Sequence, residues 1–183
     1  MDSLQGQLLI ATPRLSDPNF FHTVILLVQH GAEGALGVVL NRPLTAPVRQ
    51  VWEQVSDAPC LVEGVVHQGG PCEGPLMVVH GDADSSDLRV GDGLHFSTDK
   101  DAIERLVSAG EAPTRFFIGY AGWGAGQLEA ELAADSWLVL PAEPDHVFEE
   151  AEDLWQDLHR AATRASRPSW IPPEIMPGDP SLN

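Results

Sequence analysis

The chain has 183 residues, a length that fits one domain able to bury its own hydrophobic core without metal or disulfide support. Its 27 acidic and 10 basic residues give a formal net charge of −17, which argues against nucleic-acid binding, because affinity for a phosphate backbone rests largely on lysine and arginine. Two cysteines, Cys60 and Cys72, are too few for a disulfide framework.

The composition of the first residues leads us to expect no targeting signal. No basic stretch followed by an apolar one is present, so we expect no signal peptide. The longest apolar run, residues 24–28, is far too short to cross a bilayer as a helix. We therefore expect a cytoplasmic protein with reduced thiols and no contact with a membrane.

Short apolar runs in the first half of the chain predict strands at residues 8–11, 23–28 and 35–40. A four-residue turn joins the last two runs and predicts a hairpin. Because the runs do not alternate with polar residues, we expect a sheet that is covered on both faces. Two more strands are expected at 62–67 and 76–80, before a glycine- and aspartate-rich loop at 81–93 that contains a short edge strand.

Helices are expected to begin with Pro47 as the first helical residue, after a cap at Ser97 or Thr98, and after a cap at Asp145. The third pattern is the longest, and its apolar residues at 147, 148, 151, 154, 155, 158 and 162 follow helical spacing. Further strands are expected at 115–120, 127–132 and 137–140. Strands that outnumber helices and pair locally indicate an α+β fold. We expect one domain over residues 1–166 and an extended, proline-rich tail over 167–183.

Four glycines follow one predicted strand at positions 119, 122, 124 and 126. Glycine loops of this kind can cradle phosphate, but the spacing matches no nucleotide-binding motif and no lysine follows. The interpretation that we favour is a bent or bulged strand that requires positive φ angles. Trp123 lies within this segment, where it either plugs a neighbouring groove or serves as an exposed interface anchor; we favour the plug.

The segment Asn41-Arg42-Pro43 directly follows a predicted strand. A guanidinium at a strand end can hold a carboxylate or a phosphate, or it can pair with one of the many acidic side chains. The second use is the commoner one in an acidic chain.

Signatures of catalysis and of metal binding are missing from the sequence. The histidines show no zinc-ligand spacing, and no nucleophile elbow is present. Cys72 is better explained as an inert thiol than as a reactive one, because no cation near it is evident. We expect no metal, no cofactor and no catalytic residue.

Four ordered motifs together resemble the YqgE/AlgH family of bacterial proteins. They are residues 6–20 (GQLLIATP, then DPNF), residues 34–43 (GALGVVLNRP), residues 69–71 with His80, and residues 119–129 (GYAGWGAGQLE) with Glu131 and Trp137. The resemblance extends over roughly residues 6–158. It implies an α+β fold in which a bifurcated, largely antiparallel sheet is rolled into a pseudo-barrel with flanking helices. It implies no defined reaction, although one branch is named as a transcriptional regulator.

Our leading hypothesis is a non-enzymatic protein that acts, in a regulatory role, through an unknown protein or small ligand. The candidate surface is formed by the motif residues Asn41, Arg42, His80, Trp123 and Gln127. A second hypothesis is an enzyme in which Arg42 holds an anion and His80 acts as acid or base. The third, transcriptional regulation by direct DNA binding, is disfavoured by the net charge.

Overall fold

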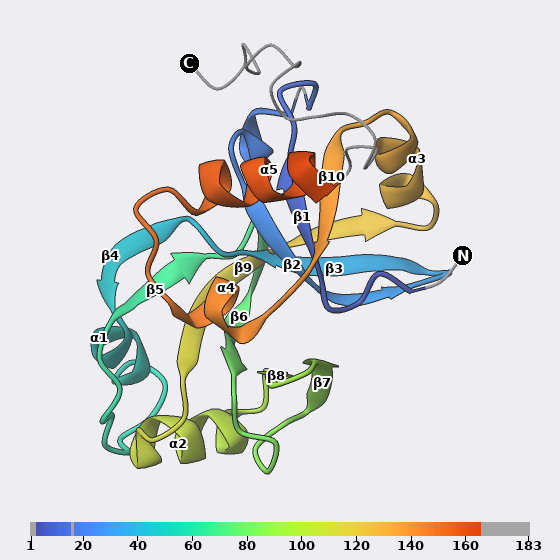
Figure 1. Ribbon diagram of the computed structural model, residues 1–183. Helices are drawn as coiled ribbons and strands as arrows, with labels where there is room; N and C mark the ends of the chain where they lie inside the picture. Colours follow the sequence, from blue (N-terminus) through green and yellow to red (C-terminus); the bar gives the residue numbers. More distant parts are fainter. Residues whose placement is uncertain (1–2, 16, 166–183) are drawn as a thin grey trace.

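The computed structural model describes residues 3–15 and 17–165 (Figure 1). The tail expected at 167–183 lies outside these residues. The strands are β1 (Gln7–Ala11), β2 (Val24–Gly31), β3 (Gly34–Val39), β4 (Pro43–Pro47), β5 (Val65–Gln68), β6 (Cys72–His80), β7 (Leu88–Gly91), β8 (Leu94–Ser97), β9 (Thr114–Gly124) and β10 (Trp137–Pro141). The helices are a 3-10 turn η1 (Pro18–Phe20) and α1 (Val48–Trp52), α2 (Lys100–Ala109), α3 (Gln127–Ala133), α4 (Pro144–Phe148) and α5 (Leu154–Ala165).

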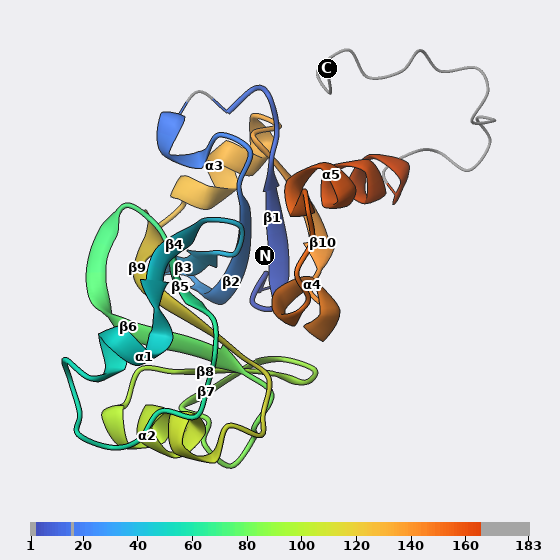
Figure 2. The same ribbon diagram turned by 90° about the vertical axis from the view of Figure 1, so that its left-hand side faces the viewer.

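The strands form one curled sheet in the order β10-β1-β2-β3-β9-β6-β8-β7, while β5 joins β9 and carries β4 at its outer side. All pairs are antiparallel except β5 with β9. Figures 1 and 2 show the sheet rolled into a half-barrel, with α3 and α5 towards one end and α1 and α2 towards the other. The expected α+β fold with a bifurcated sheet is confirmed.

The sheet forks along one edge of β9. Over Phe116–Ile118 this edge pairs with β5, and over Ala121–Gly124 it pairs with β3. The opposite edge pairs with β6. Between the two branches, Gly69 donates its N–H to the Ile118 carbonyl and accepts from the Val39 N–H, so that one residue bonds to both β9 and the end of β3.

Three apolar clusters fill the spaces around the sheet. One lies inside the half-barrel and is closed by α4 and α5, and the second lies behind β1, β2 and β3, under α3 and η1. Leu8 and Leu26 belong to the first cluster, whereas Leu9 and Ile25 belong to the second. Strands β1 and β2 are thus covered on both faces, as their unbroken apolar runs predict. The third cluster fills the space between β5, β6, β9 and helices α1 and α2.

Two sequence-based expectations are wrong. Residues 127–133 form helix α3 rather than a strand, because Gly126 in a left-handed conformation (φ 74°) starts a helical turn that buries Leu128. The long helix expected from Asp145 is broken into α4 and α5. Glu149 is extended (φ −80°, ψ 145°), and a continuous helix would place Glu149 one turn from both Glu152 and Asp153, where like charges repel.

Other boundaries shift by a few residues. Strand β4 occupies the segment before α1, so Pro47 precedes the first helical residue instead of being it. Helix α2 is capped by Asp99, whose side chain accepts from the Ala102 N–H, rather than by Ser97 or Thr98. The edge strand expected within 81–93 is β7.

Two glycines of the β9 segment allow a matched test of the fork. Gly119 and Gly126 have nearly equal φ angles, 76° and 74°, but a Cβ at Gly119 would lie 2.8 Å from the Cys72 carbonyl oxygen, whereas one at Gly126 would meet nothing within 4 Å. Gly126→Ala should therefore lower the free energy of unfolding by about 1–2 kcal/mol, the cost of the left-handed backbone. Gly119→Ala should lower it by at least about 3 kcal/mol, because overpacking adds to that cost.

Urea denaturation of both variants measures the difference. Equal losses would show that the fork tolerates a side chain and that the close approach does not constrain it.

Candidate functional site

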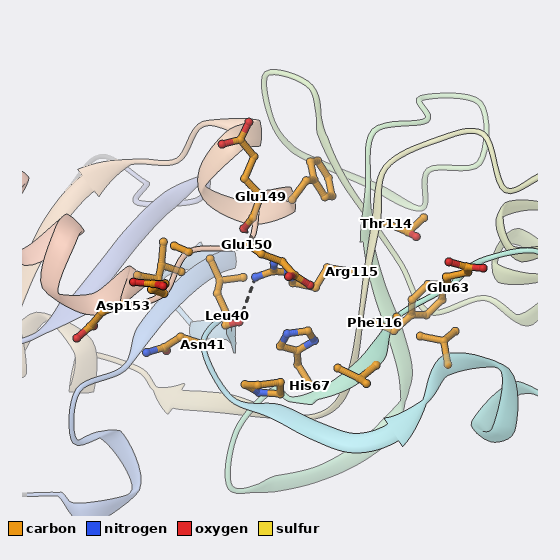
Figure 3. A pocket seen from close by; sticks show the side chains of 18 residues that line it. Leu40, Asn41, Glu63, His67, Thr114, Arg115, Phe116, Glu149, Glu150 and Asp153 are labelled. Atoms are coloured by element: carbon orange, nitrogen blue, oxygen red, sulfur yellow. Dashed lines mark hydrogen bonds between the residues drawn. The ribbon is translucent and has the colours of Figure 1, made fainter.

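A cavity of about 570 Å³ opens where the sheet forks. Its walls come from the two residues that follow β3, the segment from β4 to β5, the start of β9, and residues 148–154, which run from the end of α4 to the start of α5. Figure 3 shows Arg115 and His67 near its centre, with carboxylates placed around them. The volume is in the range of small-molecule sites.

Among the described residues, Arg115 is the only cation that lines this cavity. Nη1 donates to the Leu40 carbonyl at 3.2 Å and Nη2 to the Glu149 carbonyl at 3.3 Å. Among the described residues, no carboxylate lies within 4.0 Å of the guanidinium. Burial lowers the pKa of Arg115, and the nearby Glu150 carboxylate opposes that shift. The group stays charged at neutral pH, since an arginine does not lose its proton in a protein.

His67, on strand β5, is half-buried and lies beside Arg115 of β9 (Figure 3). Burial, and then the charge of Arg115, lower its pKa to about 4. Its Nδ1 atom is buried and has no hydrogen-bond partner among the described residues. At neutral pH the cavity therefore offers one charged donor group and one neutral imidazole.

Carboxylates surround these two side chains. Five acidic residues line the cavity, namely Glu63, Glu149, Glu150, Glu152 and Asp153. Together with one guanidinium and a neutral His67, five carboxylates leave the lining with a net charge of −4. A cation and a ring of anions thus face the same space without forming an ion pair.

Asn41 and Arg42 both hold the loop before β2. Asn41 accepts from the Val24 N–H at 2.9 Å and donates to the His22 carbonyl at 2.8 Å, while Arg42 Nη2 donates to the Phe21 carbonyl at 3.4 Å. His22 has a φ of 52°, a left-handed conformation that these contacts support. Asn41 also lines the cavity, whereas Arg42 does not.

Trp123 and Gln127 meet at Glu131 on α3. The Glu131 Oε2 atom accepts from the indole N–H groups of Trp123 and Trp137 at 3.0 and 2.8 Å, and its Oε1 accepts from Gln127 at 3.2 Å. Trp123 is only 5% exposed and stacks on Phe20. Its position matches the role of a core plug, while Gln127 is exposed.

His80 lies in a third place, at the end of β6. It is fully buried, and its Nε2 atom is 3.0 Å from the Ser97 hydroxyl. Burial, and then the neighbouring His95, lower its pKa. The structure therefore brings Trp123 together with Gln127 and Asn41 together with Arg42, and it keeps His80 apart from both pairs.

Metal binding finds no support in the part of the chain that the structure describes, which contains no group of three His, Cys, Asp or Glu residues placed to hold an ion. Both cysteines are free, Cys60 buried and Cys72 half-buried. No described helix is long and apolar enough to span a membrane.

Arg115 and His67 are absent from the sequence-based candidates. One signal could have indicated Arg115, because it is the only charged residue of a strand whose next two residues, Phe116 and Phe117, are fully apolar. A cation forced next to buried residues requires partners. His67 lies at the end of a short apolar run, but nothing in the sequence around it indicates a functional role.

Comparisons with known proteins agree along most of the chain. A family model described as AlgH-like matches residues 8–165. The chain is 38% identical to a UPF0301 protein of Streptomyces avermitilis, over 100% of this chain and 97% of that protein. It is 44% identical to a UPF0301 protein of Xanthomonas oryzae pv. oryzae, over 84% of this chain and 86% of the relative.

Two solved structures share the fold. The solution structure of the AlgH protein from Pseudomonas aeruginosa is 36% identical, with a TM-score of 0.72 over 91% of this chain and 90% of that one. A crystal structure of a protein from Corynebacterium diphtheriae is 28% identical, with a TM-score of 0.71 over 88% of each chain.

The environment of His67 predicts an unusual titration. An NMR titration of its imidazole should show a midpoint near pH 4, because burial and Arg115 both oppose protonation. Arg115→Gln should raise that midpoint without restoring the ordinary value, since burial is the larger cause. Between pH 6.5 and 4 the unfolded chain binds the proton more readily, so His67 should make stability fall as the pH falls through this window. A midpoint at about 6.5 in the wild-type protein would contradict the burial of this ring.

The Glu131 contacts predict a clear difference between two variants on α3. Glu131→Ala leaves two buried indole N–H groups without their acceptor, so the free energy of unfolding should fall by about 2–4 kcal/mol. Gln127→Ala, one turn away, loses only exposed hydrogen bonds and should cost less than about 1 kcal/mol. Chemical denaturation compares them, and equal effects would mean that Glu131 does not fix the two indoles.

Proposed function

The chain belongs to the AlgH-like family, and from the geometry of its cavity we propose that it acts by binding a small molecule that carries a carboxylate, with Arg115 as the anion-binding residue. The observation that carries this proposal is a half-buried guanidinium that faces a cavity and has no carboxylate partner among the described residues.

The hydrogen bonds of Arg115 support this role. A guanidinium has five N–H donors in a rigid plane, and two of them are used by the carbonyls of Leu40 and Glu149. These bonds hold the group in place, while its remaining donors can receive a planar carboxylate in a charge-assisted pair. The neutral ring of His67 adds a polar contact at no cost in charge.

Binding, rather than catalysis, is the use that this cavity supports. A general acid or base works best with a pKa near the working pH. The pKa of His67, at about 4, lies well below neutrality. Arg115 cannot exchange a proton at all in this range. Both side chains are therefore suited to hold a ligand, and neither is suited to transfer its protons.

A regulatory effect follows from the place of the bound group. Arg115 joins the end of β3 to the segment between α4 and α5 through two carbonyls. A ligand held by the same guanidinium would restrict that exposed acidic segment. In this proposal the ligand state of the cavity controls how residues 149–153 meet a protein partner. The cytoplasm remains the proposed location, because the free Cys60 and Cys72 suit a reducing compartment.

The alternative functions have less support. Arg42 lies beside Gln68, whose partner on β9 is Ile118, whereas His80 pairs with Thr114 on the opposite edge of β9. Strand spacings then place Arg42 and His80 roughly 15–20 Å apart. This separation is too large for one substrate to contact both groups within hydrogen-bond range. Direct DNA binding would have to overcome a net charge of −17.

Binding of pentanoate tests the proposal. Added to ¹⁵N-labelled protein at low salt, it should shift the amide signals of residues 40–41, 114–116 and 149, with an affinity in the millimolar range expected for so small a ligand. Arg115→Gln should weaken binding at least about tenfold, because the charge-assisted pair is lost. Arg115→Lys keeps the charge without the planar fork and should give an intermediate loss.

Arg42→Gln is the matched control, since it removes a nearby arginine that does not line the cavity. It should leave pentanoate binding unchanged. If pentanoate binds equally well to the Arg115→Gln and wild-type proteins, the proposed function is wrong.

A further inference from the structure

The charges that line the cavity lie on different segments of the chain. The one cation, Arg115, extends from the start of β9, whereas the carboxylates come from Glu63 before β5 and from residues 149–153 between α4 and α5. Figure 3 shows Glu150 close to Arg115, with Glu63 and Asp153 on opposite sides of it. The Glu150 charge acts on the guanidinium, yet the two groups form no contact within 4.0 Å.

This arrangement discriminates strongly among anions. A single carboxylate can neutralise Arg115, but each additional negative charge on the ligand meets five carboxylates and no second cation. Phosphates and dicarboxylates are therefore disfavoured. Among the described residues, the cavity walls include no lysine, and the N-terminus of α5 beside the cavity already has a carboxylate cap, because Asp153 accepts from the Gln156 N–H.

Cations without a carboxylate are also a poor match. A diamine would be attracted to the five carboxylates, but it would leave Arg115 half-buried and unpaired, with like charges facing one another. Apolar side chains, including Val48, Phe116 and Leu154, line the cavity beside the charged groups. They can contact a short hydrocarbon chain that joins two opposite charges.

Resting on the proposed function, we propose that the ligand of this cavity is a small zwitterion, a molecule with one carboxylate and one ammonium group. The carboxylate binds Arg115. The ammonium faces Glu150 and Glu152, two carboxylates that line the cavity. A cavity of about 570 Å³ is large enough to accommodate such a molecule whole, and the proposed occupant is a free small molecule.

Four five-carbon compounds test this proposal, because they differ only in their terminal groups. They are 5-aminopentanoate, pentanoate, glutarate and pentane-1,5-diamine, each titrated at pH 7 and low ionic strength by NMR shift perturbation. The zwitterion should bind at least about tenfold more tightly than pentanoate, since it adds a charge-assisted contact. Glutarate and the diamine should both bind more weakly than pentanoate.

A double variant of the two carboxylates that face the ammonium, called the rim variant, tests the proposal more sharply than the affinities of the wild-type protein do. In Glu150→Gln with Glu152→Gln, 5-aminopentanoate should bind several-fold more weakly, whereas pentanoate should bind more tightly because repulsion is reduced. Opposite changes for two ligands with the same five-carbon chain cannot arise from a general loss of structure. Glu73→Gln with Glu111→Gln makes the same change in net charge at exposed sites outside the cavity, and it should leave the ratio of the two affinities unchanged.

The outcomes separate this proposal from the proposed function. If pentanoate or glutarate binds as tightly as 5-aminopentanoate, and Arg115→Gln still abolishes binding, the zwitterion is excluded and the carboxylate site stands. An unchanged affinity ratio in the rim variant would also overturn the zwitterion. If none of the carboxylates binds in a manner that depends on Arg115, the proposed function itself fails.

Discussion

The close approach of three glycine backbones at the fork of the sheet is the constraint on which the rest of the structure depends. A Cβ on Gly69 would lie 2.1 Å from the Gly119 carbonyl oxygen, and one on Gly119 would lie 2.9 Å from that of Gly70. No side chain fits at these distances, so the chain can cross from the β3 branch to the β5 branch only where glycine is present. The left-handed φ of Gly119, 76°, bends β9 at the same point. Two glycine-containing motifs that lie 50 residues apart in sequence thus contact each other at the fork.

The cavity is a consequence of that fork. Where β3 leaves the edge of β9, β5 takes its place, and the end of β3 at Leu40 is left facing the start of β9. Arg115 spans this opening with its hydrogen bonds to the carbonyls of Leu40 and Glu149. Those carbonyls are available because neither is used by a helix or strand partner there: Leu40 follows the last residue of β3, and Glu149 follows α4. The hydrogen bonds of Arg115 therefore connect three features: the break between α4 and α5, the burial of Arg115 and the shape of the cavity.

Local patterns in the sequence predict the parts of this fold that depend on local chemistry. Apolar runs on both faces identify β1 and β2 as fully covered strands, and the ordered motifs identify the bifurcated sheet. The site was not predictable in the same way, because Arg115 lies 75 residues from Leu40 and 34 from Glu149. Nothing near Arg115 in sequence indicates either partner. The motif residues Asn41 and Trp123 were predicted to form part of a binding surface, yet their polar atoms are occupied by the Val24 and His22 backbone and by Glu131. Sequence motifs alone do not separate residues that hold a loop from residues that face a ligand.

The burial of Arg115 makes its unpaired state informative. Only two of the eight arginines that the structure describes have a carboxylate within 4.0 Å, although the chain has 27 acidic residues for 10 basic ones. Arg14 and Arg89 have such partners even though both are largely exposed, where an ion pair contributes little to stability. Arg115 is more deeply buried and would gain more from a carboxylate, yet the five acidic residues that line the cavity with it lie beyond 4.0 Å. A fold optimised for stability alone would close that gap with one side chain. The open gap leaves a desolvated positive charge and several negative charges facing the same small cavity, which lowers the stability of the fold. Binding of a molecule with complementary charges offsets this loss of stability.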